Sequence, residues 1–510
     1  MTDFPWLTTL AAIPLVGAVV VAALPKGREL LAKQVALAVS LVALAVTVAM
    51  SVQFDPNAKA MFQFSEIHQW IPQFGVSYAV GVDGIALVLI ALATVLTPVC
   101  ILASWHDVDE SSRSVNSYFA LLLVLETFMI GVFAATDVFL FYILFEAMLV
   151  PMYFIIGAYG GTQRSYAAVK FLLYSLFGGL LMLAAVIGLF VVSDGGDRAF
   201  LLQNLIGMHI APNTEKLLFI GFFTAFAIKA PLWPVHTWLP DAAAEAPPGG
   251  AVLLVGVLDK VGTFGMLRLC LPLFPNASRW ATPVVITLCV IGIIYGALLA
   301  IGQTDLKRLI AYTSISHFGF IAMGIFAMTS QGQSGSTLYM VNHGFSTAAL
   351  FLIAGFLISR RGSRLIADYG GVQRVAPLLA GTFLVAGLSS LALPGLSSFV
   401  SEFLVLVGTF TRYEAAAIIG TGGIILASLY ILLMYQRTMT GEPNEGTAKL
   451  PDLTRREIWV VAPLLAIIIG LGVFPKVLLD VINPAVGRTM IQIGQHDPSP
   501  VVPLIGTAAK

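Results

Sequence analysis

Charged residues are scarce in this chain of 510 residues, since Asp, Glu, Lys and Arg together make up only 11% of it. In a soluble globular protein about a quarter of the residues are charged. Hydrophobic residues reach 58% here, and the mean hydropathy is +0.91. The composition excludes an ordinary soluble domain. It indicates a polytopic membrane protein that is embedded along almost its whole length.

Cysteine and net charge are lacking as well. The three cysteines, Cys100, Cys270 and Cys289, lie in apolar surroundings without a Cys-x-x-Cys pair, which excludes cysteine-ligated iron–sulfur clusters and a disulfide framework. The formal net charge is zero, so nothing favours nucleic acid as a partner. No nucleotide-binding loop, redox-cofactor motif or set of residues with metal-ligand spacing occurs, so we predict no cofactor or metal site.

Long apolar runs are what the chain has in abundance. A helix of about 20 apolar residues crosses a bilayer, and no connection between the runs is long enough for a soluble domain. We therefore predict an all-α polytopic membrane protein in which residues 1–510 form a single membrane domain. Its 14 expected spans lie near 7–24, 33–53, 82–103, 116–135, 137–158, 166–192, 216–240, 249–271, 281–301, 307–328, 337–358, 377–410, 415–437 and 458–480.

Two of these spans are expected to be broken. The seventh carries Lys229 and, two residues later, Pro231, and the twelfth is interrupted at 393–398. Proline removes a backbone donor, and a broken helix survives in a membrane only where protein or a water-filled cavity surrounds it. The two breaks are five spans apart, which predicts two five-helix repeats, spans 4–8 and 9–13, with the second inverted. Such repeats point to a transport path near the membrane midplane.

The repeats divide the chain into four segments. Helices 1–3 occupy residues 1–110, the first repeat 111–275, the second repeat 276–440, and helix 14 with a tail 441–510. The connections after odd-numbered spans carry fifteen Lys and Arg residues, against eight at the opposite face. Because basic connections favour the cytoplasmic side, both termini are expected on the outer, periplasmic face.

Ionisable residues inside the spans form the candidate site, because such residues are costly in a membrane and usually mark ion or proton pathways. They cross successive helices near one depth and end toward one face. We expect a proton relay that consists of Glu146, Lys229, Lys260, His317 and Glu402. Three more residues are further relay candidates, namely His236, His343 and Glu126.

Each of these residues has a structural alternative. Glu146 and Lys229 could be an ion pair that holds spans 5 and 7 together, or a pair whose separation changes the proton affinity of the lysine. Asp259 could neutralise Lys260, although adjacent residues on a helix do not face each other. The histidines could be satisfied by nearby hydroxyl groups. Glu402 has no basic residue one helical turn away and is interpreted as the group that releases protons outside.

Several stretches carry a resemblance to a known family. They are DVFLFYILFEAMLVPMY at 137–153, FAIKAPLWPVHTWLPD at 226–241, DLKRLIAYTSISH at 305–317, NHGFSTAAL at 342–350 and the break at 393–403. With these motifs the chain resembles the antiporter-like membrane subunits of respiratory complex I, NADH:quinone oxidoreductase, and is most similar to their M, or fourth-subunit, type. The resemblance covers roughly spans 3–14.

The resemblance implies a fourteen-helix fold with two inverted repeats and proton translocation driven by quinone reduction elsewhere. It assigns the coupling pair to Glu146 and Lys229 and the central lysine to Lys260. Glu402 matches the terminal proton donor, where the M type has a glutamate. One departure concerns the inner side, because Ala243 stands where many relatives have histidine, which leaves His236 alone there.

The same resemblance implies partners and cofactors. Such a chain binds no cofactor itself, and the complex uses NADH, FMN, iron–sulfur clusters and quinone in other subunits. Neighbouring L and N type subunits, the lateral helix of the L type and the lipid bilayer are the expected partners, in a bacterial plasma membrane. Two alternatives remain open: a subunit of a cation/proton antiporter or membrane-bound hydrogenase, and a purely structural anchor whose interior would be dry.

Overall fold

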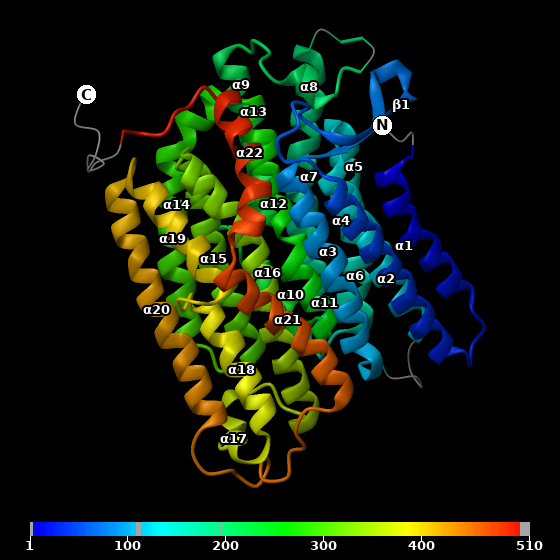
Figure 1. Ribbon diagram of the computed structural model, residues 1–510, viewed down its shortest axis with the longest axis vertical. Helices are drawn as coiled ribbons and strands as arrows, with labels where there is room; N and C mark the ends of the chain where they lie inside the picture. Colours follow the sequence, from blue (N-terminus) through cyan, green and yellow to red (C-terminus); the bar gives the residue numbers. More distant parts are fainter. Residues whose placement is uncertain (1–3, 109–113, 194, 197, 500–510) are drawn as a thin grey trace.

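A bundle of long, mostly upright helices forms the molecule (Figure 1). The structure is a computed structural model that describes residues 4–108, 114–193, 195–196 and 198–499. Within these residues, twelve helices are long and apolar enough to cross a membrane. Ten of them are α1 (Trp6–Ala23), α2 (Glu29–Gln53), α3 (Gly84–Ala103), α4 (Val115–Ala134), α7 (Arg164–Val192), α14 (Pro275–Ile301), α15 (Leu306–Phe326), α16 (Ser330–Arg361), α20 (Glu414–Met439) and α21 (Arg455–Val473).

The other two of the twelve are composite. One is α5 (Val138–Ala147) followed directly by α6 (Leu149–Tyr159). The other, Pro248–Leu273, alternates between α-helix and the wider π-helix: α11 (Pro248–Leu253), η3 (Leu254–Leu258), α12 (Lys260–Gly265), η4 (Met266–Cys270) and α13 (Leu271–Leu273). π-Helical turns inside α-helices frequently occur at functional sites.

The two expected breaks are confirmed. The seventh span consists of α9 (Pro212–Lys229) and α10 (Trp238–Glu245), and the twelfth consists of α18 (Pro377–Ser390) and α19 (Ser397–Phe410). The expectation of a mostly helical polytopic membrane protein is likewise confirmed. In Figure 1, α1 begins and α22 ends at the same, upper end of the bundle.

In the break of the seventh span, other protein groups supply the hydrogen bonds that the backbone has lost. Pro231 has no backbone N–H, so the N–H of Leu232 bonds to the carbonyl of Ala227 instead, at 2.9 Å. The carbonyl of Ile228 is thereby left without its usual helical partner, and the indole Nε1 of Trp238 donates to it at 2.9 Å. An unsatisfied carbonyl costs several kcal/mol in a membrane, so Trp238 stabilises the break.

In the break of the twelfth span, serine and asparagine side chains form the hydrogen bonds that hold the two halves. The amide Nδ2 of Asn342 on α16 donates to the carbonyl of Ser397 at 2.5 Å. The hydroxyl of Ser346 lies 2.6 Å from that of Ser389 and 3.3 Å from that of Ser398. These contacts join both halves of the broken helix to α16, and they fix the position of α19, which carries Glu402.

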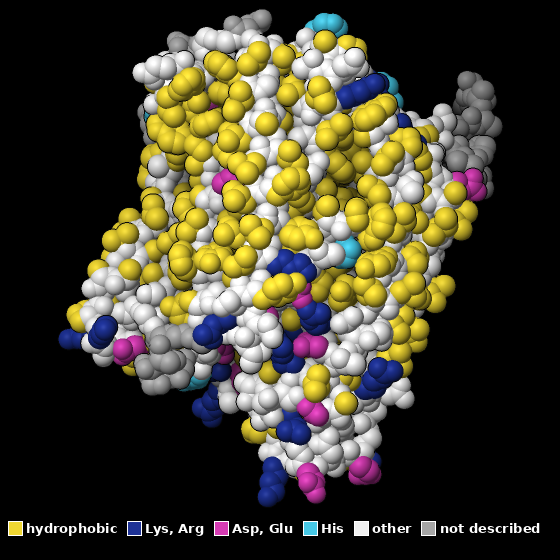
Figure 2. All heavy atoms as spheres, turned by 180° about the vertical axis from the view of Figure 1, so that it is seen from behind, with side chains coloured by type: hydrophobic (Ala, Val, Ile, Leu, Met, Phe, Trp, Pro, Cys, Tyr) yellow, Lys and Arg dark blue, Asp and Glu magenta, His cyan; other side chains and the backbone are white. Residues whose placement is uncertain are grey.

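Burial separates central helices from peripheral ones. The composite helix Pro248–Leu273 is entirely buried in its most apolar stretch, and α15 and α16 are almost so, whereas only about a third or less of α1, α2 and α21 is buried. Exposed apolar side chains cover much of the face in Figure 2, while Lys, Arg, Asp and Glu gather toward its lower end. The ionisable groups of the central helices are therefore far from bulk water and shielded from lipid by the outer helices.

Two parts of the fold differ from the expectation. Residues 63–82, predicted within a polar connection and the start of span 3, form an antiparallel hairpin of β1 (Gln63–Ile71) and β2 (Val76–Val82), so the fold is not purely α. The predicted span at 458–480 is present as α21, but it ends at Val473, earlier than expected. Pro475 ends α21, and a further helix, α22 (Lys476–Gln492), follows it and packs against α3 and α16. The short helices α8 (Leu202–Leu205) and α17 (Val372–Val375) lie in connections.

Candidate functional site

Lys229 is the last residue of α9, directly before the seventh break. It is 1% exposed, and its Nζ has no hydrogen-bond partner among the described residues. The ammonium lies 4.9 Å from the ring centroid of Phe145 and 5.8 Å from that of Phe171. Aromatic faces attract a cation, so Lys229 is held in an aromatic cage and not by a direct salt bridge.

Glu146 lies next to this cage, one residue after Phe145 on α5. Its carboxylate packs against Gly179 of α7, where a Cβ atom would lie 2.9 Å from Oε2 and closer still to the other carboxylate atoms. No ion pair within 4 Å joins Glu146 to Lys229 in the described part of the chain, yet their charges interact electrostatically. The pair is thus near but separated, and a small side-chain movement can change its interaction.

Lys260 is the second buried lysine, at the start of α12. Its side chain is 0% exposed, and its Nζ lies 2.5 Å from the carbonyl of Val255 and 2.7 Å from Nδ1 of His343. When Lys260 is an ammonium it has only donors, so Nδ1 of His343 accepts and the histidine proton is on Nε2. The alternative that Asp259 neutralises Lys260 stays open, because the two charges interact although the Asp259 carboxylate has no hydrogen-bond partner among the described residues.

His343 contacts the next polar residue of the site, His317 on α15. The two imidazole rings meet edge to face, with centroids 5.2 Å apart, and Nε2 of His317 lies 3.2 Å from the hydroxyl of Tyr430 on α20. The Tyr430 phenol interacts electrostatically with Glu402 on α19. Glu402 is 4% exposed and also faces Tyr339 of α16. A row of polar groups thus runs from Lys260 toward Glu402, with close contacts as far as Tyr430.

The remaining candidates lie away from this row. His236 occupies the segment between α9 and α10, packs on Tyr295 with ring centroids 5.2 Å apart, and is 2% exposed. The charge of Lys170 acts on His236. Lys170 itself forms an ion pair with Asp241 at 2.7 Å. Glu126 on α4 is fully buried, and neither of its carboxylate oxygens has a partner among the described residues. The structure therefore does not bring Glu126 into contact with the other candidates.

Two residues with a place at the site were not found from the sequence, and a third was found but given a smaller role. Tyr430 and Tyr339 were overlooked because a tyrosine inside a span reads as an amphipathic hydrophobic residue, although a fully buried hydroxyl needs a partner. Asp259 was weighed only as a neutralising neighbour of Lys260. In each case the available signal was a polar atom inside an apolar run, without any indication of what it faced.

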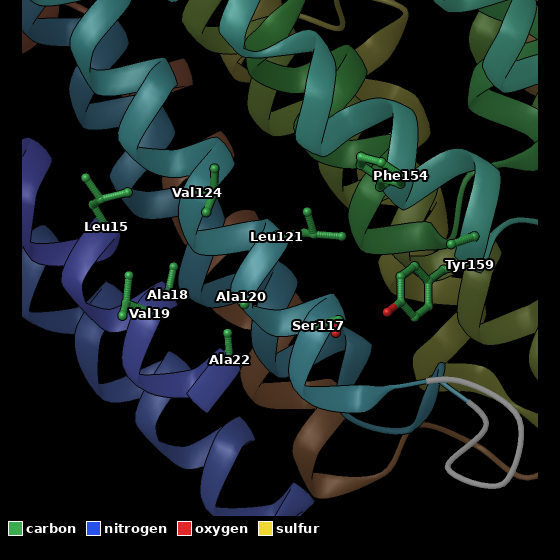
Figure 3. Close-up of a pocket in the computed structure, with 11 residues that line it drawn as sticks. Leu15, Ala18, Val19, Ala22, Ser117, Ala120, Leu121, Val124, Phe154 and Tyr159 are labelled. Carbon is green, nitrogen blue, oxygen red and sulfur yellow. The ribbon is translucent and has the colours of Figure 1, made fainter. Parts of the chain in front are cut away.

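Two hollows lie apart from the polar row, since none of the relay candidates lines either of them. An apolar hollow of about 440 Å³ lies between α1, α4 and α6. Figure 3 shows residues that line it, such as Leu15, Val124 and Phe154. A second hollow, of about 680 Å³, lies where α16 ends and is charged, since Glu245, Lys307 and Arg364 line it. Because its lining is charged, the second hollow is the better candidate for contact with water, at the end of the bundle where α16 ends.

Two family descriptions match this chain over most of its length. Residues 135–427 match the family described as NADH:quinone oxidoreductase/Mrp antiporter, TM. Residues 30–132 match the amino terminus of NADH-ubiquinone oxidoreductase chain 4. The matched regions include all the relay candidates named above.

Curated relatives agree with these descriptions. The chain is 55% identical to NADH-quinone oxidoreductase subunit M of Mycobacterium tuberculosis (strain ATCC 25618 / H37Rv), over 98% of this chain and 97% of the relative. It is 40% identical to subunit M of Rhodobacter capsulatus, over 94% of this chain and 96% of the relative. Both alignments cover almost the whole of this chain and of the relative.

Solved structures share the architecture. A chain of respiratory complex I from Thermus thermophilus with bound NADH superimposes with a TM-score of 0.87 at 29% identity, covering 96% of this chain and 100% of that one. A chain of the Mrp complex from Dietzia sp. DQ12-45-1b has the same fold, with a TM-score of 0.84 at 23% identity and coverage of 97% and 100%. The chain therefore belongs to the antiporter-like membrane subunits of NADH:quinone oxidoreductase, in the group formed by subunit M and chain 4.

Proposed function

We propose that this chain translocates protons through its own buried side chains as a subunit of an NADH:quinone oxidoreductase. The observation that carries the proposal is the set of buried titratable groups from Lys229 to Glu402, of which Lys260, His317 and His343 lie on the most buried helices. Chains of Asp, Glu, Lys and His with water are the usual material of proton relays in membranes. The reaction at this chain is the movement of a proton, and the driving energy comes from quinone reduction in other subunits.

The relay begins at Glu146 and Lys229. While the two are near each other, the carboxylate stabilises the protonated lysine. When a change of charge in a neighbouring subunit draws Glu146 away, Lys229 keeps only the faces of Phe145 and Phe171. The lysine then releases its proton toward the centre of the chain.

Lys260 receives the proton at the centre. Its 2.7 Å contact with His343 and the ring contact between His343 and His317 supply the next two steps. Tyr430 connects His317 to Glu402. Glu402 then releases the proton on the outer face, while His236 and Glu126 remain candidates for side branches of the route.

The wider setting follows from the family. We propose that the segments 111–275 and 276–440 are the two inverted repeats, between the helices of 1–110 and those of 441–510. Neighbouring L and N type subunits, with the lateral helix of the L type, contact this chain in a bacterial plasma membrane, and both termini face the periplasm. NADH, FMN, iron–sulfur clusters and quinone act in other subunits, and this chain has no redox centre of its own.

Two alternatives use the same observations. A subunit of a cation/proton antiporter or of a membrane-bound hydrogenase would share the fold, but 55% identity to an NADH-quinone oxidoreductase subunit favours the oxidoreductase. A purely structural anchor would use its buried charges only to hold helices together, and its interior would be dry. Ordered water between Glu146 and Glu402 would therefore favour the relay. Lys229 Nζ has no hydrogen-bond partner among the described residues, so it does not hold two helices together by a direct salt bridge.

Replacing Lys229 tests the proposal. The variant Lys229→Ala in the assembled complex should abolish the proton translocation that depends on this chain, measured as protons moved per NADH oxidised in inverted membrane vesicles. Lys216→Ala is the matched control, because Lys216 is on the same helix and lies over Trp280, 5.0 Å from its ring centroid, near the start of α9. An unchanged proton ratio in an assembled Lys229→Ala complex would remove Lys229 from the mechanism.

A further inference from the structure

Asp259 is a buried carboxylate that the relay described above does not use. It directly precedes Lys260, its side chain is 0% exposed, and neither carboxylate oxygen has a hydrogen-bond partner among the described residues. An ionised carboxylate that is buried without a partner is very unfavourable. A residue of this kind needs a compensating charge, a proton or water, and each of these connects it to proton chemistry.

The packing of α12 shows which way Asp259 faces. Gly262 lies directly against the end of α9, where a Cβ atom would be 2.5 Å from the carbonyl oxygen of Phe226 and 2.6 Å from the backbone N of Ala230. Residues three positions apart share one face of a helix. Asp259 therefore faces the same end of α9, whose last residue is Lys229.

Lys260 faces in another direction. Its Nζ is bound to Val255 and to His343 of α16. Two consecutive residues of one helix therefore face two different neighbours, with Asp259 toward α9 and Lys260 toward α16. The charge of Asp259 interacts with both Lys229 and Lys260.

We propose that Asp259 is a proton-carrying link between Lys229 and Lys260. The inference deepens the proposed function and rests on it. The Asp259 carboxylate has no hydrogen-bond partner among the described residues, so each transfer passes through a bridging water. In the first step the Lys229 ammonium gives a proton to the Asp259 carboxylate, which produces a neutral amine and a carboxylic acid. In the second step the acid gives that proton to the neutral amine of Lys260, which becomes an ammonium while Asp259 returns to the carboxylate.

The placement also explains how the first half of the chain communicates with the second. Without Asp259, the proton has to pass from an aromatic cage on α9 to a lysine whose Nζ is turned toward α16. A carboxylate on the face between them can accept from one lysine and donate to the other. Each transfer also moves a unit of charge toward the second half of the chain, so the state of Lys229 is felt at Lys260.

Three variants in the whole complex test the link. Asp259→Asn keeps the shape but cannot carry a proton, Asp259→Glu keeps the carboxyl group, and Thr263→Val is the matched control. Thr263 lies one turn further along α12, is fully buried, and its hydroxyl donates to the carbonyl of Lys260 at 3.0 Å. Assembly of the complex and protons moved per NADH oxidised are measured in inverted vesicles for each.

We expect Asp259→Asn to assemble and to slow proton transfer through this chain by roughly a hundredfold, the lower end of what a positioned acid–base group contributes. Asp259→Glu should restore the proton ratio at least in part, which a purely structural role for Asp259 does not predict. Thr263→Val should match the parent complex. If Asp259→Asn fails to assemble, Asp259→Ser supplies a smaller variant without the carboxyl group for the same measurement.

The outcomes separate this inference from the proposed function. If Lys229→Ala and Lys260→Ala lose proton translocation while an assembled Asp259→Asn or Asp259→Ser complex keeps the full ratio, the link is overturned and the relay stands. If the lysine variants also keep the full ratio, the proposed function itself fails.

Discussion

The Nζ atom of Lys260 lies 2.7 Å from Nδ1 of His343, although the two residues are 83 positions apart in the chain. Lys260 belongs to the segment expected as the first repeat, and His343 to the segment expected as the second. The contact joins a π-interrupted helix to the long central helix α16. The two halves of the molecule thus meet through groups that can exchange a proton and not only through apolar packing.

Loss of this contact should slow the relay without unfolding the chain. His343→Ala removes the acceptor of a buried ammonium, and leaving a buried charged group with one partner fewer costs about 1–3 kcal/mol. We expect Lys260 to hold its proton less well and the ratio of protons per NADH to fall in inverted vesicles. Ser336→Ala on the same helix, whose hydroxyl donates to the carbonyl of Ile321 at 2.7 Å, is the control. Equal ratios in the two variants would exclude His343 from the route.

The contact between Glu146 and Gly179 predicts a strong effect from a small change. Gly179→Ala places a Cβ atom against the Glu146 carboxylate and forces that carboxylate to a new position. We expect Gly179→Ala to weaken the coupling of NADH oxidation to proton translocation while the complex still assembles. The matched control is Gly381→Ala on α18, where a Cβ atom meets nothing within 4 Å. In that helix the added methyl group should stabilise by up to about 1 kcal/mol. A normal proton ratio in Gly179→Ala would show that the position of Glu146 is not critical.

The ion pair between Arg268 and Asp83 predicts an effect on stability instead of activity. The two side chains are 5% and 1% exposed and lie 2.8 Å apart. Arg268→Met should destabilise the complex by roughly 3–5 kcal/mol because it leaves Asp83 charged and buried. Asp83 also caps α3 by accepting from the backbone N of Ala86 at 3.0 Å, and asparagine can take over that cap.

The double variant Arg268→Met with Asp83→Asn should therefore recover most of the lost stability, as read from thermal unfolding of the purified complex. Proton translocation by the double variant should remain near that of the parent. If the double variant is as unstable as Arg268→Met alone, the pair does more than balance charge.

The breaks could be predicted from sequence because their causes are local. Pro231 and Pro394 each lack a backbone donor, and a long apolar run on both sides gives the break only one reading. The same holds for a few helix starts, where the capping residues Asp83, Asp137 and Asp305 precede the first turn. The list of ionisable residues inside spans was equally accessible, since each is costly in lipid whatever it faces.

What could not be predicted depends on contacts between distant helices. Nothing near Lys260 in the chain indicates that its partner is His343, or that Tyr430 lies between His317 and Glu402. The π-helical turns were missed because they change the facing of residues without changing the apolar pattern. The hairpin at 63–82 was predicted as a connection because strands outside the apolar runs carry a weak signal. The end of α21 before Pro475 was predicted too late because a single proline near the end of a span also carries a weak signal.

The hydrogen bond from the Trp238 indole to the Ile228 carbonyl limits what can move during turnover. If the indole left, that carbonyl would lose its hydrogen bond, which costs several kcal/mol in a membrane, so the connection between α9 and α10 resists movement. The parts that move are then side chains, such as the flexible four-carbon side chain of Lys229, while the backbone that carries it stays in place. Motion in this half of the molecule therefore consists of changes in side-chain rotamer, and the helices need not move.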